Sequence, residues 1–364
     1  MYWERWSSPW RRSNGSFEGA DAVALAAVHI EKGGEVKQQS WRVALAVLAT
    51  VALALGVALG GAGAANSKPK VAVILSVGLK DTGYGLSALS GITKIQKQLG
   101  LEVASTDHVK PADFATALAG YASRGYGLVI ADGVEFQDAA KEVATQFPDV
   151  QFLVINGFLG IPPNLSAMDF RWEQAGYLGG LAAGLATKTN VVGNIGGIKI
   201  PPIERLFYGF QQGLKAVNPK AKLVTSWVGS FTDPGKAKTV AEAQISKKVD
   251  VIWAIADSGN TGIFQAVTGK KVLAIGYGSD EYKLAPKHMV TTTLVDYGKT
   301  IFEGAKLAME GKLEPKAYVN GFEEGVFGLA PTRGLMPKAM VAKLNPLVAK
   351  AKSGAVKIKP MPSK

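Results

Sequence analysis

The sequence predicts an α/β protein built from two doubly wound lobes, each containing a parallel sheet. From Lys70 onward, apolar runs of strand length alternate with segments of helical periodicity, and this alternation occurs in two successive series. The apolar runs are continuous, as is typical of parallel strands that helices cover on both faces. Two such series predict two α/β lobes with a binding cleft between them.

The first series starts at residue 71. Residues 71–77 form the first predicted strand, and Leu89, Ile92 and Ile95 share one face of a predicted helix over 87–99. The other predicted elements of this series are strands at 101–105, 128–131 and 152–155 and helices near 112–123 and 137–146.

The second series follows a predicted crossover strand and helix at 168–187. Its predicted elements are strands at 191–195, 223–228, 251–255 and 272–275 and helices at about 203–217 and from Pro234. A second crossover is expected at 290–295, then a helix at 300–309 and a last extended segment at 318–329. We assign 66–172 and 291–314 to lobe I, 173–290 and 315–332 to lobe II, and 333–364 to a C-terminal helical tail.

A targeting segment precedes the lobes. Lys37 and Arg42 form a basic region, residues 43–59 are an apolar run, and Ala62-Gly63-Ala64 offers the small-residue pattern that signal peptidase cuts after. We therefore expect a signal peptide over 36–65 and export to the periplasm or the outer face of the cytoplasmic membrane. A retained anchor is the alternative, because the extended run approaches the ~20 apolar residues of a spanning helix.

Residues 1–35 show neither a helical nor a strand period, although a signal peptide normally stands at the start of a chain. We therefore expect translation to start at Val36. Residues 1–35 would then be either a disordered leader or a segment that is not translated.

The composition excludes several kinds of chemistry. The 364 residues include no Cys, which excludes disulfides, Cys-ligated zinc, a Cys nucleophile and a lipid-modified Cys. The net charge of +12 is carried mostly by scattered lysines near predicted turns and helix ends. Because these lysines are not interleaved with Arg and aromatic residues, we expect a solvated surface rather than a nucleic-acid interface.

The sequence offers little support for catalysis. His29, His108 and His288 lack metal-ligand spacing, and neither a G-x-S-x-G elbow nor a Walker-type loop occurs. The Gly-rich run at 193–197 lacks the spacing of the dinucleotide fingerprint. We therefore expect no enzyme activity, no metal and no cofactor.

Residues suited to ligand binding follow strand after strand. Asp81 and Tyr84 come after the first predicted strand, Asp132 after the third, and Gly259 and Asp280 after two strands of the second series. Asp and Gly occur in turns for local reasons, so each residue alone is a weak signal. Their repetition is stronger, because an open α/β sheet binds ligands at the edge where its strands end.

The segment WVGSFTDPGKAK at 227–238 is the most informative part of the chain. Gly229 permits a sharp turn after the predicted strand, and Asp233-Pro234 predicts a helix start with Asp at the N-cap and Pro at the first helical position. Phe231 lies in this turn, at the carboxyl end of the strand. The local pattern leaves two interpretations open: Phe231 caps the local core, or it contacts a ligand.

From Lys70 to about Leu329 the sequence resembles the basic membrane protein family, the purine-nucleoside-receptor-like (PnrA-like) substrate-binding proteins of ABC importers. The matching motifs are FRWEQAGYLGGLAAGLATKTNVVGNIGGIKIPPIERLFYGFQQGLKAVNP at 170–219 and VGSFTDPGKAK at 228–238. The resemblance implies a type I periplasmic-binding fold, with two lobes joined by a multi-crossover hinge. It also implies closure of the lobes on a nucleoside or related base and a partner ABC permease in the inner membrane.

The resemblance implies ligand contacts for several residues. Phe231 and Tyr84 match the two aromatics that stack on the purine, and Asp81 matches an acidic residue of the first loop. Asp280 matches an Asp associated with ribose hydroxyls, and Gly259 lies in the Gly-rich strand exit that lets the backbone approach the sugar.

Three positions depart from the family pattern: Gly85 replaces an Asn, Gly278 replaces an Asp, and Thr293 replaces a Lys. Contacts to the base edge and ribose are thus fewer, whereas the aromatic pair is kept. We expect a monomeric solute-binding protein, without nucleic-acid partners, that closes on a purine base, nucleoside or similar flat heterocycle. The alternatives are a nucleoside hydrolase of the cleft and a ligand-sensing subunit of the same fold.

Overall fold

The computed structural model describes residues 69–81 and 83–362. The leader expected over 1–35 and the signal peptide expected over 36–65 lie outside the described residues. Within the described part of the chain, no helix is both long enough and apolar enough to cross a bilayer.

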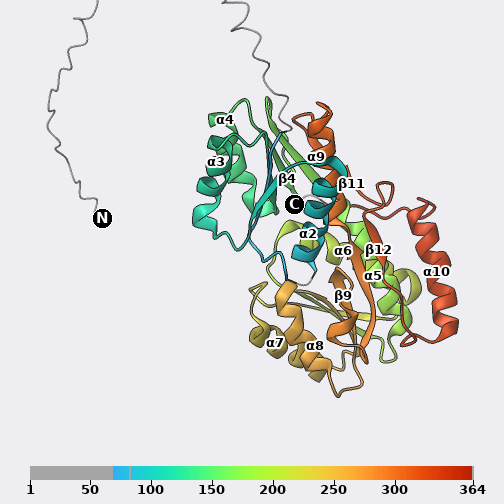
Figure 1. Ribbon diagram of the computed structural model, residues 1–364. Helices are drawn as coiled ribbons and strands as arrows, with labels where there is room; N and C mark the ends of the chain where they lie inside the picture. Colours follow the sequence, from blue (N-terminus) through green and yellow to red (C-terminus); the bar gives the residue numbers. More distant parts are fainter. Residues whose placement is uncertain (1–68, 82, 363–364) are drawn as a thin grey trace, which may run out of the picture. The chain divides into compact units, whose positions relative to one another are not determined.

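The first lobe contains a six-stranded sheet in which every pair of neighbouring strands is parallel. Helices α3 (Phe114–Ser123) and α4 (Gln137–Gln146) cover one face, and α2 (Tyr84–Lys94) and α9 (Tyr297–Met309) cover the other (Figure 1). Burial on both faces explains the continuous apolar runs. In spatial order the strands are β11 (Ala317–Asn320), β5 (Leu165–Phe170), β4 (Gln151–Ile155), β3 (Leu128–Asp132), β1 (Val71–Leu75) and β2 (Val103–Thr106).

The second lobe repeats this plan with a sheet of six strands, of which β12 alone runs antiparallel to its neighbour. Helices α5 (Trp172–Ala186) and α6 (Pro201–Val217) cover one face, and α7 (Pro234–Ser246) and α8 (Asn260–Val267) cover the other. In spatial order the strands are β12 (Phe327–Leu329), β10 (Met289–Val295), β9 (Leu273–Gly278), β8 (Val251–Ile255), β6 (Val191–Gly196) and β7 (Lys222–Trp227).

The fold is therefore the predicted α/β class with two doubly wound lobes, but two segments differ from the expected lobe boundaries. Residues 291–295, expected in lobe I, belong to β10 and pair with β9 of the second sheet. The extended segment expected at 318–329 in lobe II is two strands in different sheets, because β11 pairs with β5 of the first sheet. An apolar run predicts that a strand forms, but it does not predict which strand pairs with it. That pairing depends on hydrogen bonds to residues far away in the sequence. The helical tail contains α10 (Lys338–Lys352), which packs against α5.

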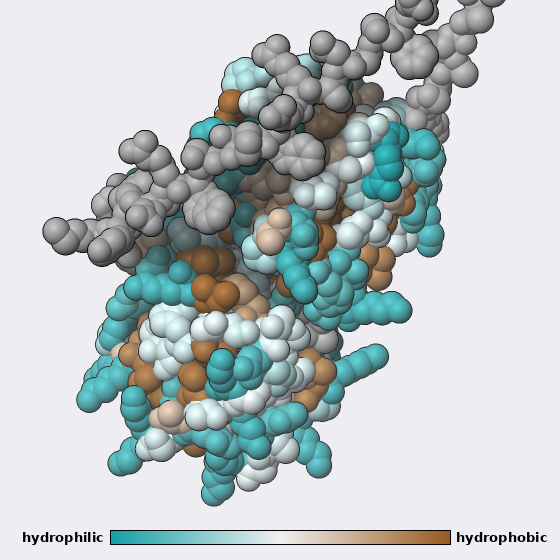
Figure 2. Space-filling model, turned by 90° about the vertical axis from the view of Figure 1, so that its left-hand side faces the viewer, coloured by the Kyte–Doolittle hydropathy of each residue, from teal (hydrophilic) through white to brown (hydrophobic). Residues whose placement is uncertain are grey.

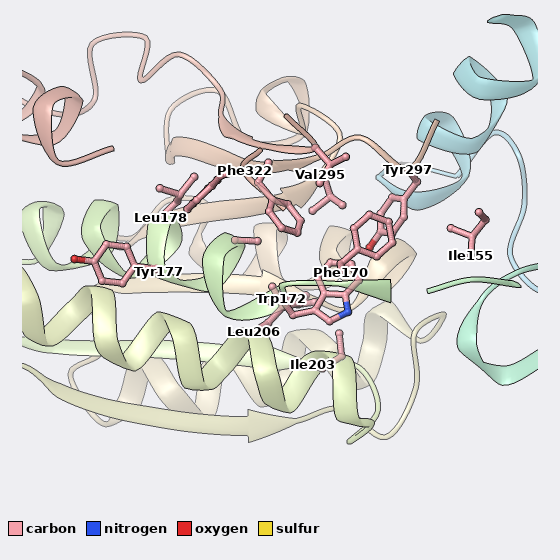
Figure 3. Packing of buried hydrophobic residues seen from close by; sticks show 14 of the residues in the cluster. Ile155, Phe170, Trp172, Tyr177, Leu178, Ile203, Leu206, Val295, Tyr297 and Phe322 are labelled. Carbon is pink, nitrogen blue, oxygen red and sulfur yellow. The ribbon is translucent and has the colours of Figure 1, made fainter. Parts of the chain in front are cut away.

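The chain passes between the lobes after β5, after β10 and after β11, and four aromatic rings pack together at these crossings. The ring centroids of Phe170 and Trp172 are 4.7 Å apart, and that of Tyr297 is 5.4 Å from Phe170 (Figure 3). The ring of Phe327 lies 5.9 Å from Trp172. The three crossings thus share one apolar cluster, which joins the cores of the two sheets.

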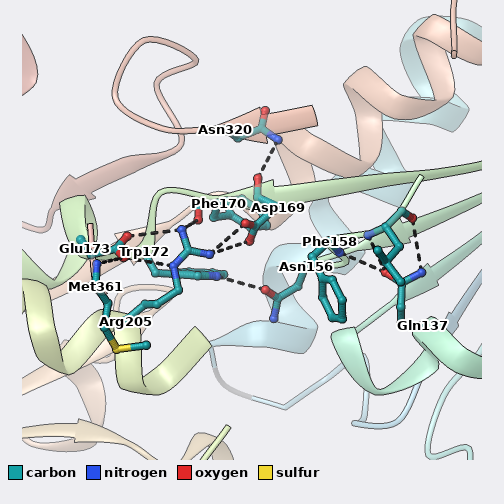
Figure 4. Close-up of polar contacts among 11 residues, drawn as sticks. Gln137, Asn156, Phe158, Asp169, Phe170, Trp172, Glu173, Arg205, Asn320 and Met361 are labelled. Carbon is teal, nitrogen blue, oxygen red and sulfur yellow. Dashed lines mark hydrogen bonds and ion pairs between the residues drawn. The ribbon is translucent and has the colours of Figure 1, made fainter. Parts of the chain in front are cut away.

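An ion-pair network fixes helix α6 to the first crossing. The Arg205 guanidinium donates to Asp169 of β5 at 2.8 Å and to Glu173 of α5 at 3.1 Å (Figure 4). The C-terminal segment joins this network, because the backbone N–H of Met361 donates to Glu173 at 2.9 Å. The buried carboxylate of Glu173 and the half-buried carboxylate of Asp169 therefore share a cationic partner.

The surface agrees with the expected solvated lysines. Lysines 220, 222, 236, 238, 247, 248, 270 and 271 are all exposed. Figure 2 shows hydrophilic side chains over much of one face of the molecule.

Helices α5 and α6 touch through their backbones at glycine positions. A Cβ atom on Gly213 would lie 2.1 Å from the carbonyl oxygen of Tyr177, and one on Gly176 would lie 2.0 Å from the carbonyl oxygen of Leu206. Contacts this short leave no room for any side chain. The close approach holds α5, which begins at Trp172, directly against α6, which begins at Pro201.

We expect Gly213→Ala to lower the free energy of unfolding by about 1–3 kcal/mol, because the added methyl group forces the helices apart. The matched control is Gly120→Ala in α3, where a Cβ meets no atom within 4 Å. That change should be neutral or stabilise by up to ~1 kcal/mol. Chemical denaturation followed by circular dichroism measures both, and equal stability of the two variants would contradict the backbone contact.

Candidate functional site

Residues that follow the carboxyl ends of strands in both sheets line a cavity of about 100 Å³. Five of the lining side chains are aromatic: Tyr84, Trp172, Phe231, Tyr277 and Tyr297. The polar side chains on its wall are those of Ser76, Glu135, Asn156 and Asp257. Among the described residues that line this cavity, none is Lys, Arg or His.

Three tyrosines from both lobes form one side of the aromatic lining. Tyr84 begins α2 directly after Gly83, and its ring centroid is 4.2 Å from that of Tyr297 at the start of α9. The hydroxyl of Tyr297 is 2.8 Å from the hydroxyl of Tyr277, which stands near the end of β9. Burial raises the pKa of all three hydroxyls, so they stay protonated and act as neutral hydrogen-bond groups.

Trp172 and Asn156 line the cavity at the first crossing between the lobes. Trp172 is fully buried, and its ring nitrogen donates to the Asn156 side-chain oxygen at 3.1 Å (Figure 4). Asn156 follows β4 in the left-handed backbone region, with φ of 62°. This bond ties the exit of a first-lobe strand to the first helix of the second lobe.

Phe231 lies in the turn between β7 and α7. The expected helix start is confirmed: the Asp233 carboxylate accepts from the Lys236 N–H at 3.0 Å, and Pro234 opens the helix. The Phe231 ring lies against the backbone after β6, because a Cβ on Gly197 would come within 2.3 Å of it. The half-buried ring thus packs on the core edge and also lines the cavity.

Carboxylates gather at the first-lobe side of the cavity. Asp132 is fully buried at the end of β3, and its Oδ1 accepts from the Tyr84 hydroxyl at 2.7 Å. In the described part of the chain, its Oδ2 has no hydrogen-bond partner. Burial raises the pKa of Asp132 to about 8. Glu135 accepts a short hydrogen bond from the Ser76 hydroxyl.

Asp257 supplies a carboxylate from the second lobe, just after β8. Its backbone is left-handed, with φ of 51°, and among the described residues its buried Oδ1 has no hydrogen-bond partner. Burial, followed by the nearby charges of Asp81 and Glu135, raises the pKa of Asp257 to about 7. Each lobe therefore contributes a carboxyl group whose pKa is raised to about 7 or 8, so that both groups titrate near neutral pH.

The lobes also touch through two glycines next to the cavity. The Ser279 hydroxyl donates to the Gly83 carbonyl at 2.8 Å, and a Cβ on Gly278 would lie 3.0 Å from the Gly83 Cα. Both glycines have positive φ, 83° for Gly83 and 87° for Gly278. The first loop of lobe I is thus in direct contact with the β9 exit of lobe II.

The structure brings together some of the residues expected to bind ligand and not others. Tyr84 and Phe231 line the cavity from different lobes, and Asp132 contacts Tyr84. Gly259 lies behind the lining, where its N–H donates to the Phe231 carbonyl at 3.0 Å. The remaining two, Asp81 and Asp280, do not line the cavity.

Both of these carboxylates are occupied by other partners. Asp81 accepts from the Gly78 N–H at 3.0 Å and so closes the first loop on itself. Asp280 forms an ion pair with Arg333, which lowers the pKa of Asp280. Thr293, the position of the missing Lys, is fully buried in β10.

Seven of the aromatic and polar residues that line the cavity were not predicted from the sequence: Ser76, Glu135, Asn156, Trp172, Asp257, Tyr277 and Tyr297. Asp257 and Tyr277 lie in strand exits that the sequence singled out, but their neighbours Gly259 and Asp280 were chosen. Trp172 and Tyr297 begin helices directly after a crossing, and no local pattern distinguishes them from core aromatics. Among the described residues, no group of three or more His, Asp or Glu is placed to hold a metal ion.

The chain matches a known family over most of its length. The family described as ABC transporter substrate-binding protein PnrA-like matches residues 68–360. Basic membrane protein A of Borreliella burgdorferi is 30% identical over 276 residues, which are 74% of this chain and 81% of that protein. A purine-binding protein of Brucella abortus is 30% identical over 311 residues, which are 85% and 87%. An ABC transporter nucleoside-binding protein of Lactococcus lactis is 26% identical over 76% of this chain and 86% of that protein.

Solved structures agree on the fold. A solute-binding protein of an ABC transporter from Aeropyrum pernix has a TM-score of 0.72 at 21% identity, and the match covers 81% of this chain and 94% of that one. A solute-binding protein from Conexibacter woesei has a TM-score of 0.66 at 25% identity, and the match covers 80% of this chain and 99% of that one.

We expect Asp132→Asn to become steadily more stable, relative to the unchanged protein, as the pH rises from about 4 to about 8. In this window the unfolded Asp ionises but the folded one stays protonated, so the unchanged protein loses stability as pH rises. Asn removes this titration and can still accept from Tyr84. Melting temperatures across the pH range measure the difference, with exposed Asp149→Asn as control. A pH-independent difference for Asp132→Asn would show that this carboxyl titrates normally.

We expect Gly278→Ala to keep the lobes apart, because its methyl group would meet the Gly83 backbone. The matched control is Gly125→Ala, which has a φ of 78° but no atom within 4 Å of the added Cβ. Both changes carry the same backbone strain, about 1–2 kcal/mol. Small-angle scattering should give a larger radius of gyration for Gly278→Ala only, and identical curves would count against the closed contact.

Proposed function

We propose a ligand class from one premise: the chain belongs to the PnrA-like family of ABC transporter substrate-binding proteins. It is accordingly an extracytoplasmic solute-binding protein that serves an ABC permease, and its role is binding rather than catalysis. The nucleoside hydrolase considered from sequence is thereby set aside. The signal peptide at 36–65, the start at Val36 and a periplasmic location stay predictions.

The ligand that we propose is a purine base or another flat heterocycle. The observation that carries this proposal is the aromatic cavity, to which Tyr84 contributes from the first lobe and Phe231 from the second. Stacking of a base on an aromatic side chain contributes ~1–3 kcal/mol per base. The relatives from Brucella abortus and Lactococcus lactis, described as purine-binding and nucleoside-binding, support the same class.

A bare ring suits this cavity better than an intact nucleoside. Asp280, the residue expected at the ribose, is paired with Arg333 and does not line the cavity. The replaced position Gly278 lies against the backbone of Gly83 of the other lobe, which leaves no room there for the longer Asp side chain. The polar wall that remains is suited to N–H groups on a ring edge.

Closure couples this binding to transport. A ring between Tyr84 and Phe231 contacts both lobes only when they are shut, so the ligand stabilises the closed state by its differential affinity. The permease would then recognise the closed lobes. Trp172 and Tyr297, which begin helices at two crossings, join the binding surface to the hinge.

A thermal-shift screen of bases, nucleosides, sugars and amino acids tests the proposal. A ligand that binds only the folded protein stabilises it by RT ln(1 + [L]/Kd), so its class separates from the others. We expect one or more flat heterocycles to raise the melting temperature. A shift with sugars or amino acids, and none with heterocycles, would refute this ligand class.

We expect Phe231→Ala to weaken the base found in that screen by about 1–3 kcal/mol, because one stacking face is lost. Phe231→Leu keeps apolar bulk without the ring and should recover only part of the affinity. The control is Tyr126→Ala, an aromatic that packs on Tyr121 before β3 begins, at the other end of the first sheet. Titration calorimetry measures all three, and unchanged affinity in Phe231→Ala would return this ring to the core.

A further inference from the structure

The ionisable groups at the cavity wall are all acidic, so any charge that they carry is negative. Glu135 and Asp257 line the cavity, and Asp132 stands directly behind Tyr84. Tyr84 and Glu135 act on Asp132, and Asp132 in turn acts on Tyr297. Asp81 and Glu135 act on Asp257, and Asp257 in turn acts on Glu281, Tyr277 and Tyr297. All of these groups are acidic or phenolic, so this part of the described chain supplies no cation to the cavity.

Buried and half-buried acids elsewhere in the same protein have compensating partners. Asp169 and Glu173 share the Arg205 guanidinium. Glu281, which is 3% exposed, accepts from the Asn260 amide at 3.2 Å and from the Tyr277 N–H at 2.9 Å. At the cavity the compensation is incomplete, because Asp132 Oδ2 and Asp257 Oδ1 have no hydrogen-bond partner among the described residues.

A positive charge in this cavity would interact favourably with both the carboxylates and the aromatic rings that line it. Carboxylates buried without a partner are unfavourable unless an opposite charge or donor pairs with them. The faces of Trp, Tyr and Phe rings attract a cation within about 6 Å of their centroids. We propose that the ligand is a planar nitrogen heterocycle that is bound as a cation, with a protonated or alkylated ring nitrogen. This inference rests on the proposed function, since it assumes that a flat ring occupies the cavity.

The charge requirement sorts ligands beyond their shape. A ring that carries phosphate or carboxylate would place like charges together in the closed cavity and is excluded. A neutral ring would bind only while the carboxyls keep their protons, so its affinity should fall as pH rises. A cation pairs with the ionised carboxyls, so its affinity should rise with pH and its binding should release protons.

The test uses matched pairs of rings that differ by one methyl group on a ring nitrogen and the permanent charge that it creates: quinoline and N-methylquinolinium, and nicotinamide and its ring-N-methylated cation. Adenine is included as a neutral purine. Calorimetry on the purified protein gives each affinity from about pH 6 to about pH 9. We expect at least one cation to bind about tenfold more tightly than its neutral partner, and the ratio to grow with pH.

Asp257→Asn should reduce the preference for the cation by about tenfold, and Asn suits this position because it tolerates a left-handed backbone. Glu135→Gln should act in the same direction. The matched control is Glu142→Gln, an exposed carboxylate on α4 of the first lobe, which should leave the preference unchanged.

Each result decides the question. If adenine or another neutral ring binds and no cation binds more tightly than its partner, the charge proposal is wrong and the flat-heterocycle proposal stands. If no ring binds in either form while sugars or amino acids do, both proposals fall. If a cation is preferred equally in the unchanged protein and in Asp257→Asn and Glu135→Gln, the carboxylates are not its recognition groups.

Discussion

The packing of Phe170, Trp172, Tyr297 and Phe327 at the three lobe crossings is the interaction on which the rest of the structure depends. These rings come from β5, α5, α9 and β12, so one cluster holds every point where the chain changes lobe. Trp172 and Tyr297 also line the cavity. The hinge and the binding surface therefore share two side chains, and a ligand that contacts them acts directly on the part of the molecule that moves when two lobes close.

Close backbone contacts near the cavity also join the two lobes. Helices α5 and α6 pack closely through glycines, and Arg205 of α6 forms an ion pair with Asp169 of the first sheet. On the opposite loop, Gly83 and Gly278 let the two lobes touch without a side chain between them. Glycines thus set how closely the two helices and the two lobes approach each other, and the large aromatic residues fill the space between them.

The sequence predicted the class of the fold, the alternation of its elements and the turn that holds Phe231, because these depend on local periodicity and capping. It did not predict the sheet to which β10 or β11 belongs, since both sheets accept the same apolar run. At the site, the aromatics Tyr84 and Phe231 were found from the motif and line the cavity. Asp280 was expected there as well, but it pairs with Arg333, which lies 53 residues away in the sequence. No pattern within the strand exit predicts that ion pair.

Asp257 combines two unfavourable features at one residue of the cavity wall. Its φ of 51° lies in the left-handed region, which glycine would adopt without strain, and its Oδ1 is buried without a partner. Asn156, across the cavity, shares the left-handed backbone. Neither feature of Asp257 improves the packing of the fold, because glycine would relieve the strain and remove the buried charge together. Strained, unpaired groups of this kind persist where a bound molecule completes them, and the carboxylate of Asp257 is placed to be completed by a positive charge between aromatic rings.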